Sequence, residues 1–203
     1  MNYTYRQKTQ PELESIAKRL WTNCPHANNG FANVERLVES LGFTILPRPG
    51  LAKLSRLDGY VPKERGFVVV DAELSTLSPD RYRVTLAEEL AHHQLEPELW
   101  DQGVPVGANI YELDKEIHDL IESDAYNLAL AILMPADTTG ERYSFALQQV
   151  MAEGPQINAD WMAVEMLANE VKVPTRACAH RCRKLGLCNV DIVSKPIEGA
   201  VIM

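Results

Sequence analysis

Residues 83–93 read Arg83-Val-Thr-Leu-Ala-Glu-Glu-Leu-Ala-His-His93. If this stretch is helical, Glu88 and His92 lie one turn apart on one face, and Glu89 lies one step round from Glu88. His93 turns about 100° away from His92, so we expect it to face solvent or to pack locally. Carboxylates and imidazoles are both groups that bind divalent metals. The stretch therefore predicts a helix with a metal-binding face, and the rest of the chain is interpreted around it.

The same spacing occurs in the H-E-x-x-H helix of metallopeptidases. In that helix the residues at i and i+4 bind the metal, and the glutamate after the first of them is the general base for a water. Here Glu88 stands in the place of the first histidine, Glu89 in that of the base, and His92 in that of the second ligand. A catalytic site of this kind needs a third protein ligand from elsewhere in the chain. Glu122, on a second predicted helix, is the candidate.

Two further residues of that second helix are open alternatives as metal ligands. His118 lies one turn before Glu122 and could replace the imidazole that Glu88 does not supply. Asp124 falls within the apolar stripe of the helix, so it is either a buried structural carboxylate or an alternative third ligand.

Composition limits the classes of protein. The chain has 203 residues, 46% of them hydrophobic, which suits one large domain or one domain with a small appendage. Its formal net charge of −8 does not favour nucleic acid or an anionic membrane as a partner. A polar N-terminus and short apolar runs predict neither a secretory signal nor a membrane span. The four cysteines are then expected to be reduced, packed thiols in a cytoplasmic protein.

Periodicity predicts an α+β fold in two parts. We expect a metallopeptidase-like domain over 1–153, in which a small β-sheet packs against the motif helix and the second ligand-bearing helix. A helical C-terminal subdomain, helix-turn-helix-like and followed by a tail, is expected over 154–203. The predicted helices span 11–21, 32–41, 83–93, 111–134, 143–151, 159–171 and 175–185, and the strands span 43–46, 57–61 and 66–71. The strands are expected to form a meander, with irregular chain at 74–80, a loop at 97–108 and a break at 138–140.

The last predicted helix is basic in an acidic chain. After 159–171 and a tight turn it imitates the recognition helix of a helix-turn-helix. Arg181, Arg183 and Lys184 also lie near a helix C-terminus, where the helix dipole favours cations, and this explanation is preferred over DNA binding. A basic face for an acidic protein partner is a third explanation.

Several segments, in order along the chain, resemble the ImmA/IrrE-type metallopeptidases, which are bacterial and phage proteins that cleave transcriptional repressors. Residues 83–93 resemble R-F-T-L-A-H-E-L-G-H-H, and residues 122–135 resemble E-x-x-A-N-x-F-A-x-x-L-L-M-P. The lead-in at 38–45, the strand at 57–60 and the ending at 167–187 are also similar. The chain departs from the pattern at Glu88, at Ala91 and at Tyr126, where the family has His, Gly and Asn or Asp.

The resemblance implies Glu89 as general base and His92 and Glu122 as ligands, with Glu88 a ligand only by substitution. It implies zinc. With two carboxylate ligands, however, the site charge falls from +1 to 0, which acidifies a bound water less and moves preference towards manganese or iron. We therefore expect an atypical metal-dependent endopeptidase acting on a regulatory protein such as a repressor. The alternatives are a degenerate pseudopeptidase without metal that serves as a protein-binding module, and a DNA-binding regulator.

Overall fold

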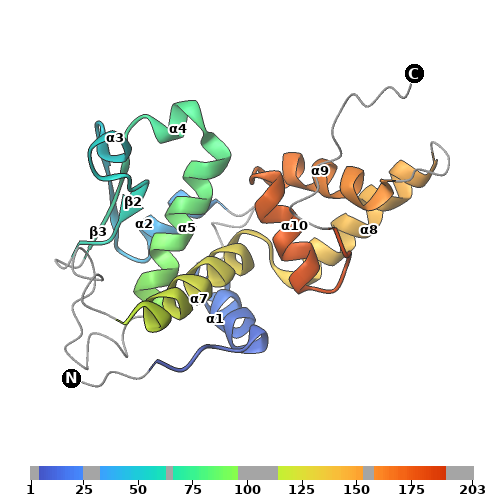
Figure 1. Cartoon of the computed structure of the whole chain (residues 1–203), viewed down its shortest axis with the longest axis horizontal. Helices are drawn as coiled ribbons and strands as arrows, with labels where there is room; N and C mark the ends of the chain where they lie inside the picture. Colours follow the sequence, from blue (N-terminus) through green and yellow to red (C-terminus); the bar gives the residue numbers. More distant parts are fainter. Residues whose placement is uncertain (1–4, 25–32, 63–65, 96–113, 153–157, 191–203) are drawn as a thin grey trace.

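The computed structural model describes residues 5–24, 33–62, 66–95, 114–152 and 158–190. The predicted α+β fold is confirmed: a small sheet and several helices pack around the motif helix α5 (Pro79–Leu95) and the long helix α7 (Lys115–Leu133). In Figure 1, α5 lies between the sheet and α7, and the C-terminal helices form a second group beside them. No described helix is both long enough and apolar enough to cross a bilayer.

The described residues form a three-stranded sheet in the order β1-β3-β2. The central strand β3 (Phe67–Asp71) pairs in parallel with β1 (Thr44–Arg48) and antiparallel with β2 (Gly59–Tyr60). The predicted meander is therefore wrong, because β1 pairs with the third strand and the chain reaches that strand through the short helix α3 (Leu51–Ser55). Pro47 does not end β1 as expected, since an edge strand tolerates a residue that lacks an N–H.

The helices before and after the sheet pack against the two long helices α5 and α7. Helix α1 (Gln10–Asn23) packs on α7, and α2 (Val34–Ser40) packs on α5. Residues 74–80, expected to be irregular, instead contain the short helix α4 (Leu74–Leu77) and the start of α5. Helix α4 forms there because burying Leu74 outweighs the weak helix propensity of the serine and threonine that follow it.

The core is built where α5 and α7 meet. Helix α7 starts near the end of α5 and runs back across it (Figure 1). Alanines let the two backbones approach, and Ala87, Ala91, Ala125 and Ala129 are all fully buried. Large apolar side chains of both helices fill the space around them, among them Leu86, Leu90, Leu128 and Ile132. Polar side chains on the adjoining faces are thereby held on a rigid base.

The C-terminal helices are α8 (Ala136–Ala152), α9 (Ala159–Val171) and α10 (Thr175–Lys184). The predicted break at 138–140 is wrong, because α8 runs through it with Thr139 buried and Gly140 close to Leu187. The α9 bounds and the turn before α10 are confirmed. The division at 153/154 remains a prediction, and the loop expected at 97–108 lies outside the described residues.

Two arginines fasten the C-terminal helices to the rest of the molecule. Arg181 is 1% exposed, and its Nη1 and Nη2 atoms lie 2.5 and 2.9 Å from the two carboxylate oxygens of Glu14 in α1. Its Nε donates to the carbonyl of Met134 at the end of α7. Arg83 of α5 donates to the carbonyl of Lys172, in the turn between α9 and α10.

Candidate functional site: a carboxylate and histidine cluster between two helices

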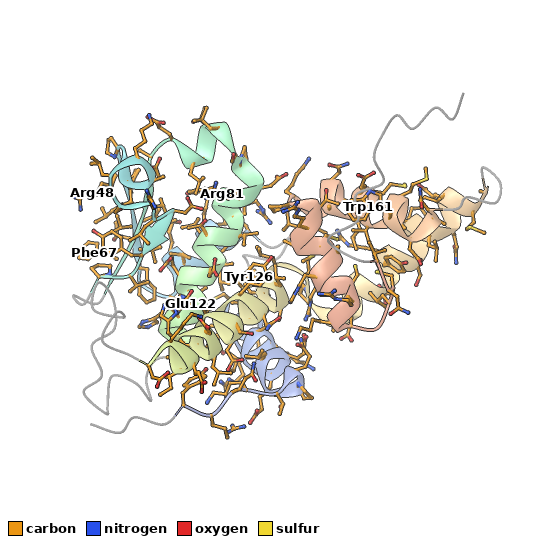
Figure 2. All side chains as sticks on the ribbon, in the orientation of Figure 1. Arg48, Phe67, Arg81, Glu122, Tyr126 and Trp161 are labelled. Carbon is orange, nitrogen blue, oxygen red and sulfur yellow. The ribbon has the colours of Figure 1, made fainter. Side chains whose placement is uncertain are left out.

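The facing sides of α5 and α7 bring together the predicted pair His92 and Glu122. The Nε2 atom of His92 lies 3.6 Å from Oε1 of Glu122, and the His92 side chain is 11% exposed. Figure 2 shows Glu122 and Tyr126 on the side of α7 that faces α5. Burial opposes ionisation of Glu122, but the interaction with His92, by hydrogen bonding and by charge, and the charge of His118 together lower its pKa. The pair is thus a carboxylate kept ionised beside an imidazole.

The separation of this pair fits a shared metal ion. Two ligand atoms that each lie about 2 Å from one ion at a tetrahedral angle are about 3.4 Å apart, close to the observed 3.6 Å. In the described part of the chain, no group of three or more His, Cys, Asp or Glu side chains is gathered tightly enough to hold an ion. The described residues therefore bring two candidate donors together and do not form a complete site of three ligands.

His118 contacts the same carboxylate oxygen. Its Nε2 lies 3.7 Å from Oε1 of Glu122, and its Nδ1 lies 3.7 Å from Oδ1 of Asp119. Its side chain is 36% exposed at the start of α7. Glu122 therefore contacts two imidazoles, one from each helix.

Glu88, in the altered position of the motif, has a different environment from the other candidates. Its pKa is raised to about 7, chiefly by burial; the charge of His92 opposes this shift, and the nearby carboxylates of Glu122 and Asp58 add to it. A large fraction of Glu88 is consequently protonated at neutral pH in the metal-free protein. A protonated carboxyl must lose its proton before it can bind a cation. Among the predicted ligands, Glu88 is therefore the one whose binding to a metal is most opposed by protonation.

Glu89, the predicted base, lies against the edge of the sheet. A Cβ atom at Gly59 would lie 3.3 Å from Cγ of Glu89, 2.8 Å from Cγ2 of Thr85 and 3.0 Å from the carbonyl oxygen of Val69. Only glycine leaves room there for the motif helix to approach β2. Gly59 is a functional position that the sequence reasoning missed, although a glycine within a strand is a known signal of close backbone approach.

Asp124 and His93 have structural partners instead. Asp124 is 1% exposed, and its Oδ2 accepts hydrogen bonds from the Tyr5 hydroxyl at 2.8 Å and the Lys8 amide at 2.7 Å. These bonds hold the N-terminal segment on α7, so the geometry favours the structural explanation of Asp124. The ring of His93 packs edge-on against Phe43, with centroids 4.5 Å apart.

A helix from the C-terminal group also reaches the site. The ring of His180 in α10 packs edge-on against Tyr126, and its Nε2 lies 2.9 Å from Oδ1 of Asn127. Burial, followed by the charge of Glu88, raises the pKa of Tyr126, so its hydroxyl stays protonated. The sequence reasoning missed His180, because a contact between residues 54 positions apart leaves no local signal.

The fold and the spacing of these residues, on two helices beside a small sheet, resemble those of a metallopeptidase. The chain matches the peptidase M78 family, described as the IrrE N-terminal-like domain, over residues 38–183, and it belongs to that family. The resemblance to ImmA/IrrE-type proteins is thereby confirmed, and the family is usually zinc-dependent. No curated protein matches the chain significantly. The match reaches into α10, so it includes the C-terminal helices.

Proposed function

We propose that the protein is an atypical metal-dependent endopeptidase of the ImmA/IrrE type that acts on a regulatory protein such as a repressor. The observation that carries the proposal is the 3.6 Å approach of His92 and Glu122 from two different helices. Membership of the peptidase M78 family supports it. His92 and Glu122 would hold the ion, and Glu89 lies next to them in the chain position of the general base.

In this proposal the ion, Glu89 and strand β2 have separate roles. A bound divalent ion supplies Lewis acidity that acidifies water and polarises a peptide carbonyl. Glu89 takes the proton of the attacking water and returns it to the leaving amine. Strand β2 lies at the edge of the described sheet, with Gly59 against Glu89. An extended peptide that pairs with this edge would lie alongside the base.

The test compares the native protein with Glu89→Gln, which keeps the shape of the side chain and removes the base. Elemental analysis of both purified proteins measures metal content, and a repressor encoded beside this protein serves as the candidate substrate. We expect both proteins to contain metal and only the native protein to cut. Cleavage by both would exclude Glu89 as the base, and an absence of metal in the native protein would exclude the enzyme.

A pseudopeptidase that binds its partner without cutting it is the second candidate function. Glu88 favours it, because this buried carboxyl replaces a neutral imidazole and holds its proton up to a pH of about 7. A stable complex of native protein and intact repressor, with no products after long incubation with zinc or manganese, would support this alternative.

The basic face of α10 gives less support to DNA binding. Arg181, one of its cations, is buried in the ion pair with Glu14 and cannot reach a phosphate. Arg176, Arg183 and Lys184 remain exposed on α10. Proteins that bind a DNA duplex specifically contact many of its phosphates. Three exposed cations are few for that purpose, and they better suit an acidic surface on a protein partner.

A further inference from the structure

We propose that the substrate protein docks an acidic segment on the basic stripe of α10, which is formed by Arg176, His180, Arg183 and Lys184. The inference rests on the proposed function, because it names the chemistry by which the substrate of that site is held. The stripe adjoins the cluster between α5 and α7, so docking there would bring a nearby peptide bond of the same protein to the site.

The four residues of the basic stripe share one face of α10. They occupy positions i, i+4, i+7 and i+8, which is the spacing of a single stripe along a helix. Arg176, Arg183 and Lys184 are exposed, and His180 is half-buried. The opposite face of α10 is buried in the core. The stripe is therefore a row of exposed cations on a helix whose orientation is fixed by packing.

The exposed cations of the basic stripe are not neutralised by the described part of the molecule. The chain has a formal net charge of −8, yet α10 contains no acidic residue. Arg142 and Arg181 form ion pairs with carboxylates of other helices. Among the described residues, no ion pair includes Arg176, Arg183 or Lys184. An acidic segment of a partner would therefore meet positive charge that the protein itself does not compensate.

The helix dipole explains only part of the basic stripe. Arg183 and Lys184 lie in the last turn of α10, where the dipole favours cations. Arg176 is the second residue of the same helix, and in the first turn the dipole disfavours a cation. Helix stability therefore does not account for Arg176, whereas a row of cations that binds an acidic segment accounts for all three exposed charges.

His180 joins the basic stripe to the candidate site. Its ring packs edge-on against Tyr126 of α7, with centroids 5.4 Å apart, and Tyr126 lies one turn beyond Glu122. Figure 2 shows Tyr126 between Glu122 and the C-terminal helices. One helical turn rises about 5.4 Å, and an extended chain covers about 3.3 Å per residue, so about three or four extended residues span from Glu122 to the stripe. We expect the acidic segment at about that distance from the cleaved peptide bond.

Fluorescence anisotropy with labelled poly-L-glutamate tests the docking surface on metal-free protein, at an ionic strength of about 0.1 M. Arg176→Glu/Arg183→Glu should bind this probe at least about 10-fold more weakly than the native protein, because two attractive charges become repulsive. The control Arg36→Glu/Arg56→Glu makes the same change of net charge at exposed positions outside α10, and its affinity should stay within about 3-fold of native. Thermal unfolding followed by circular dichroism checks that both variants are folded.

A second measurement connects docking with cleavage. With the repressor encoded beside this protein as substrate, Arg176→Glu/Arg183→Glu should raise KM at least about 10-fold and change kcat by less than about 3-fold, because the stripe holds the substrate away from the reacting bond. A short peptide that contains the cleaved bond and lacks the acidic segment should be cut equally well by the variant and the native protein.

The outcomes separate the docking inference from the proposed function. If Arg176→Glu/Arg183→Glu and the native protein bind poly-L-glutamate equally well, the inference is overturned and the proposed function stands. If the native protein binds a short DNA duplex more tightly than poly-L-glutamate, and the variant loses this preference, the stripe is a nucleic-acid surface and the inference is also overturned. If binding of poly-L-glutamate depends on the stripe but the native protein cuts no repressor, the docking of an acidic segment is supported and the proposed cleavage is overturned.

Discussion

Glu88→Gln should make the metal-free protein more stable at neutral and alkaline pH. Gln has nearly the shape of a protonated glutamate and cannot ionise. The pKa of Glu88 rises from an ordinary 4.5 to about 7 because burial, followed by the carboxylates of Glu122 and Asp58, outweighs the opposing charge of His92. Tyr126 also faces this carboxyl, and the negative charge of Glu88 raises its pKa. Ionising Glu88 therefore costs the folded state free energy that the substitution removes.

The sign and size of the effect follow from the two pKa values. A carboxyl whose pKa is raised by folding contributes its full stability below the unfolded-state value of 4.5, and that contribution is lost as the pH rises through about 7. A displacement of this size corresponds to at most about 3 kcal/mol. Glu88→Gln should therefore match the native protein near pH 4.5 and exceed its free energy of unfolding by up to about 3 kcal/mol near pH 8.

Urea unfolding followed by circular dichroism, in chelator at several pH values from 4.5 to 8.5, measures this difference. Glu141→Gln is the control, because Glu141 is an exposed carboxylate of α8. Its stability difference from the native protein should stay within about 0.5 kcal/mol at every pH. If Glu88→Gln also stays within that limit up to pH 8.5, the carboxyl of Glu88 ionises freely and the reasoning about its burial is wrong.

Three further substitutions test other parts of the structure. Arg181→Ala should lower the free energy of unfolding by about 3–5 kcal/mol, because it leaves the Glu14 carboxylate without its partner. The control Arg183→Ala, on the exposed face of α10, should change it by less than about 0.5 kcal/mol. Urea titration measures both variants. Gly59→Ala should cost about 1–3 kcal/mol in the same assay, since its Cβ would meet a backbone oxygen at 3.0 Å, and a neutral result would show that β2 can move away from α5. Glu88→His should tighten zinc binding in calorimetry and raise or create cleavage of the partner, because a neutral donor returns the site charge to +1; a variant that binds zinc and cuts nothing would favour the binding-module function.

The elements that could be predicted from the sequence are those with local signals. Helix α9 and the turn after it have the predicted bounds, because a regular apolar stripe ends at a tight turn containing Pro174. The strand order could not be predicted in the same way. Whether β1 pairs with β2 or with β3 depends on contacts across the sheet, and adjacent strands in sequence gave the wrong answer. In α8 the local break signal at Gly140 did not end the helix, which buries Thr139 and Tyr143 on either side of it.

For the site, too, local spacing could be predicted from the sequence and long-range contacts could not. The spacing within α5, together with the family pattern, was enough to predict that His92 and Glu122 would lie close together, and they do. The role of Asp124 could not be predicted from α7 alone, because its hydrogen-bond donors, Tyr5 and Lys8, are more than a hundred residues away in the chain. Glu88 shows a further limit of pattern. The sequence shows that Glu88 stands where the motif has a histidine, but the protonation of Glu88 depends on burial, which only the fold shows.

The C-terminal helices are better understood as part of the site's support than as a separate DNA-reading module. Arg83, at the start of the stretch 83–93, donates to the turn between α9 and α10, and Arg181 joins α10 to α1 and to the end of α7. His180 then packs on Tyr126, one turn beyond Glu122 on the same face of α7. A partner that binds the exposed cations of α10 would therefore press on a helix that is rigidly connected to both ligand-bearing helices. If a partner binds α10 and the cluster between α5 and α7 acts on it, as proposed above, the same buried contacts fix both surfaces.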